Sequence, residues 1–368
     1  MTLHTLHANV LTPEGWRLGP LRFDERIQAI DGAPIAQPDP ALPIALPGFI
    51  DLHVHGGGGA DTMEGAAAVR TLARLHARHG TTALLATTMT APTADVQRAL
   101  DGIAAAMASG PGDGARVLGV HLEGPWLSPQ RLGAQPPDTH AATLAELDDF
   151  CARATLRVVT LAPEEDGHLA LIPQLVARGL RVQIGHSEAS YEQGVAALAA
   201  GASGFTHLFN AMSGLHHRAP GLVGAALAHA QHAELIPDGL HVHPGALLAA
   251  LRAIPRVFAV TDATAAAGMP EGEFRLGRQT VHHCAGGVRL ADGTLAGSAL
   301  TMDRALRHLV GLGLSLAEAS DRVSRFPADY LGETERGRLA PGAHADLVLL
   351  DARLGVQAVY VAGRELPR

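Results

Sequence analysis

Two histidines, His53 and His55, stand two residues apart in the segment PGFIDLHVHGGGG, residues 47–59. In a β-strand, residues i and i+2 point to the same side, so the two imidazoles are expected to project together. They end an apolar run and directly precede a glycine-rich loop. Two converging imidazoles are a natural start for a metal site, although chance alone could produce the pair in a chain with 21 histidines.

Four more residues that can bind a metal or transfer a proton stand at or near the ends of apolar runs. They are Glu123 in HLEGP, His186 in IGHS, His207 in THLFNAM and Asp262 in VTDAT. Each alone has an ordinary structural interpretation, since a buried glutamate can pair with an arginine and an aspartate often caps a helix. Burying all of them together without a cation would be costly. The pattern therefore predicts a metal centre at which several strand ends meet.

The elements that would position these residues are strands alternating with helices. Strands are expected at residues 49–55, 83–89, 117–123, 157–162, 181–186, 204–210, 233–241 and 256–262, and helices at 67–78, 95–107, 144–152, 169–178, 192–200 and 246–252. Continuous apolar strands that alternate with helices indicate a parallel sheet covered on both faces. Eight units predict an α/β fold of the (β/α)8 type, a TIM-like barrel whose catalytic face lies at the carboxyl ends of its strands. A doubly wound open sheet is the alternative, but no GxGxxG motif supports a dinucleotide site.

The two ends of the chain differ from the middle. Residues 1–47 and 335–368 contain short strand-like pieces broken by turns, with no helical period. We expect them to pair into a small β-sandwich domain beside a barrel of residues 48–334. The helical stretch 302–330 is expected to cap or extend the barrel.

Composition excludes several classes of function. The net charge is −8 and no run of basic residues occurs, which argues against a nucleic-acid partner or an anionic membrane surface. Two distant cysteines form neither a disulfide framework nor a cysteine zinc site. No signal-peptide pattern and no apolar stretch of membrane-spanning length is present, so a cytoplasmic location is predicted.

Taken together, the motifs resemble the N-acetylglucosamine-6-phosphate deacetylases of the amidohydrolase superfamily. The matching segments are PGFIDLHVHG, HLEGPWL, GHS, THLFNAM, RAPGLVG, PDGLHVHP, VTDAT and LAGSALTMD, which span residues 47–303. The HxH pair marks only the superfamily, whereas HLEGP together with HLFNAM and DGLHV is narrower. The resemblance implies metal-dependent deacetylation of N-acetyl-D-glucosamine 6-phosphate to D-glucosamine 6-phosphate and acetate.

The resemblance also implies roles for the metal-binding residues. Glu123, His186 and His207 match the ligands of the principal divalent metal, with zinc as the first candidate. His53 and His55 match positions that hold a second metal in some relatives, so one or two ions per subunit are expected. Asp262 matches the residue that acts as general base towards the metal-activated water and then as general acid towards the leaving amine.

Substrate contacts follow from the same resemblance. Arg218 and His241 match phosphate-binding residues that can act across a subunit boundary in relatives, which implies a homodimer. Further substrate-binding positions map to Asn210, Ala211, Ala134, Leu295, Ala296 and Gly297.

One position departs from the family pattern. Relatives usually carry a histidine in a segment such as KGAHxP, and this chain has RLGAQPP with Gln135 at that place. A glutamine amide can donate a hydrogen bond but cannot become cationic. We expect Gln135 to keep the histidine's role of orienting the substrate carbonyl, with weaker electrostatic help.

Three alternatives stay open at this point. The substrate could be the 4-epimer, N-acetylgalactosamine 6-phosphate, or an N-acetyl sugar without phosphate, and the barrel could also be non-catalytic. Amidohydrolases with a carboxylated lysine as metal bridge are excluded, because the chain contains no lysine.

Overall fold

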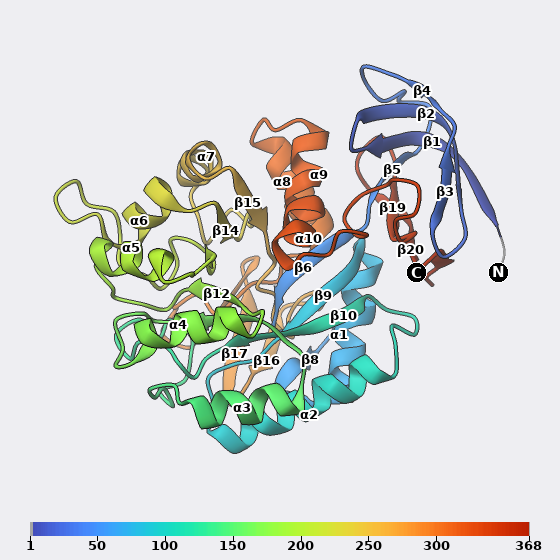
Figure 1. Cartoon of the computed structure of the whole chain (residues 1–368). Coiled ribbons are helices and arrows are strands. Elements are labelled where there is room, and N and C mark those ends of the chain that lie inside the picture. Colours follow the sequence, from blue (N-terminus) through green and yellow to red (C-terminus); the bar gives the residue numbers. More distant parts are fainter. Residues whose placement is uncertain (1–2, 368) are drawn as a thin grey trace.

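Residues 3–367 are described by a computed structural model, whose main part is a barrel of parallel strands with helices around it (Figure 1). Six strands form one parallel sheet in the order β13-β12-β11-β10-β9-β6, and β14 and β15 form a parallel pair. The barrel strands are β6 (Phe49–Val54), β9 (Thr81–Thr87), β10 (Arg116–Glu123), β11 (Leu156–Leu161), β12 (Arg181–Ile184), β13 (Gly204–Phe205), β14 (His232–Leu235) and β15 (Arg256–Ala259). All eight expected strands are present, although several are shorter than predicted.

Hydrogen bonds across the two remaining seams close the barrel. After β13, the backbone N–H of Leu208 donates to the carbonyl of Glu234 in β14, at 2.9 Å. After β15, the backbone N–H of Asp262 donates to the carbonyl of His53 in β6, also at 2.9 Å. Because these seams join the last strands to the six-stranded sheet, the (β/α)8 barrel is confirmed and the doubly wound open sheet is wrong.

Helices cover the outside of the barrel between successive strands. They are α1 (Ala66–Arg78), α2 (Thr93–Ala108), α3 (Leu144–Arg153), α4 (His168–Ala177), α5 (Tyr191–Ala199), α6 (Gly221–His229) and α7 (Pro244–Ala253). All were expected except α6, whose sequence GLVGAALAH has no polar face to mark an amphipathic period.

Three further helices replace the single helical stretch expected at 302–330. They are α8 (Met302–Gly311), α9 (Leu316–Val323) and α10 (Arg325–Leu331), and they stand between the barrel and the terminal sheet (Figure 1). Helices α9 and α10 pack against β6 and β15, so they brace the seam at which the barrel closes.

The two ends of the chain share one eight-stranded sheet with an apolar core of its own. Its strands are β1 (His4–Thr12), β2 (Gly15–Phe23), β3 (Ile27–Ile30), β4 (Ala33–Pro34), β5 (Ile44–Pro47), β19 (Leu347–Leu350), β20 (Val356–Val361) and β21 (Arg364–Glu365). Strand β5 joins the ends, because it pairs with β1 in parallel and with β19 in antiparallel orientation. The expected small β domain built from both ends is therefore present, while its division from the barrel at residues 48 and 334 stays a prediction.

An antiparallel insert between β15 and α8 was not predicted. Its strands are β16 (Gly272–Leu276), β17 (Gln279–Cys284) and β18 (Gly287–Arg289). A short hairpin of β7 (Gly56–Gly57) and β8 (Ala60–Asp61), followed by the 3-10 turn η1 (Thr62–Glu64), forms the glycine-rich loop after β6. Among the described residues, no helix is both long enough and apolar enough to cross a membrane.

Candidate metal-dependent active site

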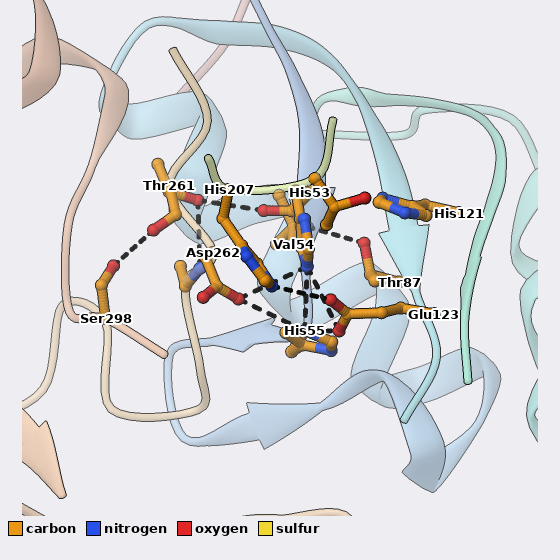
Figure 2. Close-up of polar contacts among 12 residues, drawn as sticks. His53, Val54, His55, Thr87, His121, Glu123, His207, Thr261, Asp262 and Ser298 are labelled. Atoms are coloured by element: carbon orange, nitrogen blue, oxygen red, sulfur yellow. Dashed lines mark hydrogen bonds and ion pairs between the residues drawn. The ribbon is translucent and has the colours of Figure 1, made fainter. Parts of the chain in front are cut away.

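The five predicted metal ligands lie close together, and the carboxylate of Glu123 is shared by the two histidine pairs. Figure 2 shows this carboxylate beside His53, His55 and His207. One carboxylate oxygen, Oε1, lies 3.2 Å from Nε2 of His186 and 3.1 Å from Nε2 of His207. The other, Oε2, lies 3.1 Å from Nε2 of His55 and 3.5 Å from Nε2 of His53. Glu123 therefore joins two histidine pairs, each of which completes a three-residue ligand set.

The orientation of the rings fits a bound cation. Nδ1 of His186 lies 2.9 Å from the carbonyl of Arg131, and Nδ1 of His53 lies 3.0 Å from the carboxylate of Glu234. Both partners only accept hydrogen bonds, so Nδ1 carries the proton and a neutral ring presents a bare lone pair at Nε2. The Nε2 atoms lie 3.1 Å apart within each pair. Facing lone pairs repel each other unless a proton or a metal ion lies between them.

The buried charge of the site also requires a cation. Burial opposes the charged form of His53 and His55, but the carboxylates of Glu123 and Asp262 outweigh burial and raise the pKa of both histidines, that of His55 to about 9. Burial tends to raise the pKa of Glu123, but the neighbouring histidines outweigh burial and hold this pKa well below the usual range. The carboxylates are therefore compensated either by protons on the histidines or by a metal ion that replaces them.

Asp262 lies at the edge of the cluster, beside the HxH pair. Its Oδ1 is 3.3 Å from Nε2 of His55 and 3.5 Å from Nε2 of His53. The buried Asp51 accepts hydrogen bonds from the hydroxyl of Thr261 at 2.6 Å, from the amide of Thr261 at 3.2 Å and from the amide of His53 at 3.3 Å. Asp51 thus ties β6 to Thr261, the residue that precedes Asp262.

The backbone leaves regular strand geometry at these residues. His186, His207 and Asp262 have positive φ angles of 46°, 28° and 50°. This left-handed region is disfavoured for residues with a side chain, and such strain is often found at functional sites. Each turn ends a strand and directs the side chain into the barrel mouth.

A cavity of about 200 Å3 opens over the cluster. Most predicted site residues line it, namely His55, Glu123, Ala134, Gln135, His186, His207, Asn210, Ala211, His241, Asp262, Leu295 and Gly297. Three do not: His53 is fully buried, Ala296 lies in an apolar core with the insert, and Arg218 is on an exposed loop beside His217. Lining residues that the sequence did not indicate are Met89, Gly133, Leu276 and Thr294.

His241 brings a polar donor to the cavity wall. Its Nδ1 lies 2.7 Å from the carboxylate of Asp238. Burial disfavours the charged ring, but this hydrogen bond and the charge of Asp238 outweigh burial and raise the pKa of His241. The arrangement favours an imidazolium that can face an anionic group.

Comparison with known proteins gives the family. The amidohydrolase family matches residues 44–366. The chain belongs to this family. It is 44% identical to the N-acetylgalactosamine-6-phosphate deacetylase of Escherichia coli O157:H7, over 98% of both chains. It is 41% identical to the N-acetylglucosamine-6-phosphate deacetylase of Vibrio furnissii, over 92% of this chain and 87% of the relative.

Solved structures of deacetylases match this amidohydrolase along its whole length. A mutant N-acetyl-D-glucosamine-6-phosphate deacetylase from Mycobacterium smegmatis, in complex with N-acetyl-D-glucosamine 6-phosphate, is 37% identical with a TM-score of 0.91 and covers 100% of this chain and 99% of its own. The N-acetylglucosamine-6-phosphate deacetylase from Thermotoga maritima is 30% identical with the same TM-score of 0.91, covering 100% of both chains. The resemblance to the N-acetylglucosamine-6-phosphate deacetylase family is confirmed, and the chain is a hydrolase that acts on an amide.

Sequence motifs did not indicate the residues that contact the predicted metal ligands from outside the cluster. Glu234 accepts hydrogen bonds from Nδ1 of His53 and, at 3.2 Å, from the backbone N–H of His207. His121 packs against His53 with ring centroids 4.5 Å apart, and its two nitrogens are engaged by a backbone carbonyl and a threonine hydroxyl. Burial lowers the pKa of His121 to about 4, so this ring is neutral. The one available signal was a glutamate within the apolar run 233–241.

Gln135 lies against the predicted metal ligand Glu123. Its Oε1 accepts a hydrogen bond from the backbone N–H of Thr90 at 2.8 Å, and its Nε2 donates to Oε2 of Glu123 at 2.7 Å. It also lines the cavity. Its expected role in orienting the substrate carbonyl stays a prediction.

Proposed function

We propose that this amidohydrolase converts N-acetyl-D-glucosamine 6-phosphate to D-glucosamine 6-phosphate and acetate. The observation that carries the proposal is the carboxylate of Glu123 between two histidine pairs, with Asp262 beside it at a cavity of about 200 Å3. Relatives from Vibrio furnissii and Lysinibacillus sphaericus with 41% and 40% identity bear this activity in their names.

Two clusters of closely spaced side chains support the proposed metal ligands. Glu123, His186 and His207 would hold the principal divalent ion, and His53 and His55 together with Glu123 would hold a second ion. Imidazole and carboxylate ligands suit zinc, which is the first candidate. When bound, such an ion supplies Lewis acidity, which polarises an amide carbonyl and makes water a better nucleophile near neutral pH.

Asp262 would move the proton. Burial tends to raise its pKa, but His53 and His55 outweigh burial and hold it below the ordinary range, so the carboxylate is ionised at neutral pH. An ionised carboxylate can accept the proton of the attacking water and later deliver it to the departing amine of the sugar. The hydrogen bonds of Asp51 hold Thr261, the residue before Asp262, and so help to position the turn that carries this carboxylate.

The phosphate would be bound by His241 and Arg218. His241 lines the cavity as a favoured imidazolium, whereas Arg218 lies on an exposed loop outside it. We propose that Arg218 acts in the site of a second copy of the chain, which makes the protein a homodimer. The remaining proposed substrate contacts are Asn210, Ala211, Ala134, Leu295, Ala296 and Gly297.

A second candidate substrate is N-acetylgalactosamine 6-phosphate. The relative from Escherichia coli O157:H7, which is 44% identical over 98% of both chains, is named for that substrate. The two sugars differ only in the configuration at one carbon, so the reaction chemistry at the metal ligands and Asp262 is the same for both.

The test is acetate release by metal-loaded protein from three compounds in parallel. They are N-acetylglucosamine 6-phosphate, its 4-epimer and unphosphorylated N-acetylglucosamine. The proposal expects the highest kcat/KM for the first compound and a large loss without phosphate. A higher kcat/KM for the epimer would transfer the assignment to the second candidate, and no acetate from any phosphorylated sugar would overturn both.

A further inference from the structure

The side chain of Gln135 spans two groups with fixed hydrogen-bonding character. It is only 6% exposed and sits between the backbone N–H of Thr90, just after β9, and Oε2 of Glu123. The Thr90 amide can only donate and an ionised carboxylate can only accept. The amide oxygen therefore has to face Thr90 and the amide nitrogen has to face Glu123, which is the orientation observed.

The hydrogen bond from Gln135 differs from every other contact of Glu123. Within residues 3–367, the remaining polar partners of this carboxylate are the four histidines of the two pairs. Those histidines can donate to Glu123 only from a protonated Nε2, and a bound metal ion takes the place of that proton. Once the histidines serve as ligands, Gln135 is the hydrogen-bond donor that still holds the carboxylate.

Holding the carboxylate matters because its two oxygens face different histidine pairs. Rotation of the carboxylate would move Oε1 away from His186 and His207 and Oε2 away from His55. Hydrogen bonds that orient a metal ligand typically change metal affinity by about 10–100-fold when they are removed. The amide of Gln135 is uncharged at all ordinary pH values. It can therefore orient the Glu123 carboxylate without competing with a metal ion as a second positive charge.

We propose that Gln135 is a positioning residue that orients Glu123 and thereby sets the affinity of the centre for its divalent ion. This inference rests on the proposed metal centre and is independent of the substrate. In this role Gln135 acts through Glu123. A residue that only oriented the acyl carbonyl of the substrate would have no effect on metal binding. Its loss should weaken metal binding even when no sugar is present.

The experiment compares Gln135→Leu and Gln135→Met with Gln279→Leu as a matched control. Gln279 in β17 donates its side-chain amide to the carbonyl of Ala134, so the control removes an amide that contacts the loop of Gln135 but not Glu123. Zn2+ affinity would be measured by competition with a chelating dye. Thermal unfolding of each metal-free protein reports the fold, and the visible spectrum of the Co2+ form reports ligand geometry.

We expect Zn2+ affinity to fall by about 10–100-fold in both Gln135 variants. The Co2+ spectrum should change with it, while Gln279→Leu stays within about twofold of the unaltered chain and the metal-free proteins unfold alike. If Gln135→Leu folds poorly, the metal affinity of Gln135→Met, whose side chain is unbranched like that of glutamine, tests the inference. Unchanged Zn2+ affinity and Co2+ spectrum in a folded Gln135 variant would overturn the inference, as would an unaltered chain that binds no divalent ion. Weakened Zn2+ binding together with no hydrolysis of any phosphorylated sugar would sustain the inference and reject the proposed function.

Discussion

The two histidine pairs that flank Glu123 are built in different ways. His53 lies in β6 and His55 directly follows the end of that strand, two residues further along the chain, and His53 is hydrogen-bonded to the carboxylate of Glu234. His186 and His207 come from turns after two different strands, and His186 is hydrogen-bonded to a neutral backbone carbonyl. The first pair therefore lies among more negative charge than the second.

This difference predicts an order of metal binding. The carboxylates raise the pKa of both His53 and His55 despite burial, so the first pair holds protons near neutral pH when no metal is bound. A metal ion has to displace those protons before it can bind there. We infer that the ion beside His186 and His207 binds first and most tightly, and that occupancy beside His53 and His55 rises with pH.

The largest expected effect comes from removing a ligand of the second pair. His207→Ala should lose the principal ion, and acetate release from the phosphorylated sugar should fall to background, because the other pair cannot replace this ligand set. Metal content by mass spectrometry and acetate release measure both effects. His282→Ala, which changes a half-buried histidine of β17, is the matched control and should keep both. Full activity in His207→Ala would show that the principal ion is not held here.

A smaller effect is expected for the first pair. His55→Ala should lose the second ion and keep the first. Turnover should fall by about 10–100-fold, because His55 would then act on the principal ion site as a supporting group does. Titration of the variant with Zn2+ would give the stoichiometry. If His55→Ala were as inactive and as metal-free as His207→Ala, the two pairs would form one inseparable centre and the comparison would fail.

The smallest effect is a pH dependence of stability in the metal-free protein. The pKa of His55 is raised from 6.5 to about 9, so its protonated form stabilises the fold below pH 6.5 and this stabilisation is lost as the pH rises through 9. Between pH 7 and 9 the loss is about 2 kcal/mol. Thermal unfolding should show the metal-free protein becoming less stable over this interval, while the metal-loaded protein does not.

Two other buried groups contribute less to that interval. Burial lowers the pKa of His121 to about 4, so this ring changes charge below the interval. Burial raises the pKa of Asp51 to about 7, so the upper half of its titration adds a smaller loss of stability in the same direction. In His55→Ala the slope between pH 7 and 9 should shrink. A metal-free protein that gained stability from pH 7 to 9 would contradict the assignment of protons to the first pair.

The sequence predicted the first pair more completely than the second. Period two in a strand is enough to place His53 and His55 side by side, and the structure agrees. For the second pair, the expected strands ran to residues 186 and 210, whereas β12 ends at Ile184 and β13 at Phe205. The apolar pattern continues into the barrel mouth, but the strand pairing ends two residues before His186 and His207, whose positive φ angles lie outside strand geometry.

The sequence did not predict residues that become neighbours only when the barrel closes. Glu234 supports His53 from a strand about 180 residues later, and Asp51 bonds to Thr261 across the seam between the first and last strands. Such partners follow only from knowing which strands become neighbours. The insert of β16 to β18 was missed because its short strands lie outside the repeating strand and helix units, yet its Leu276 lines the cavity.

The most direct test of the whole account is acetate release by Asp262→Asn, measured beside the unaltered chain with the ion content of both determined. The proposed function assigns proton transfer to this carboxylate and metal binding to the histidines and Glu123. The account predicts equal ion content and a kcat/KM for N-acetylglucosamine 6-phosphate that falls by about 10²–10⁴-fold. Equal ion content with an unchanged kcat/KM would contradict it.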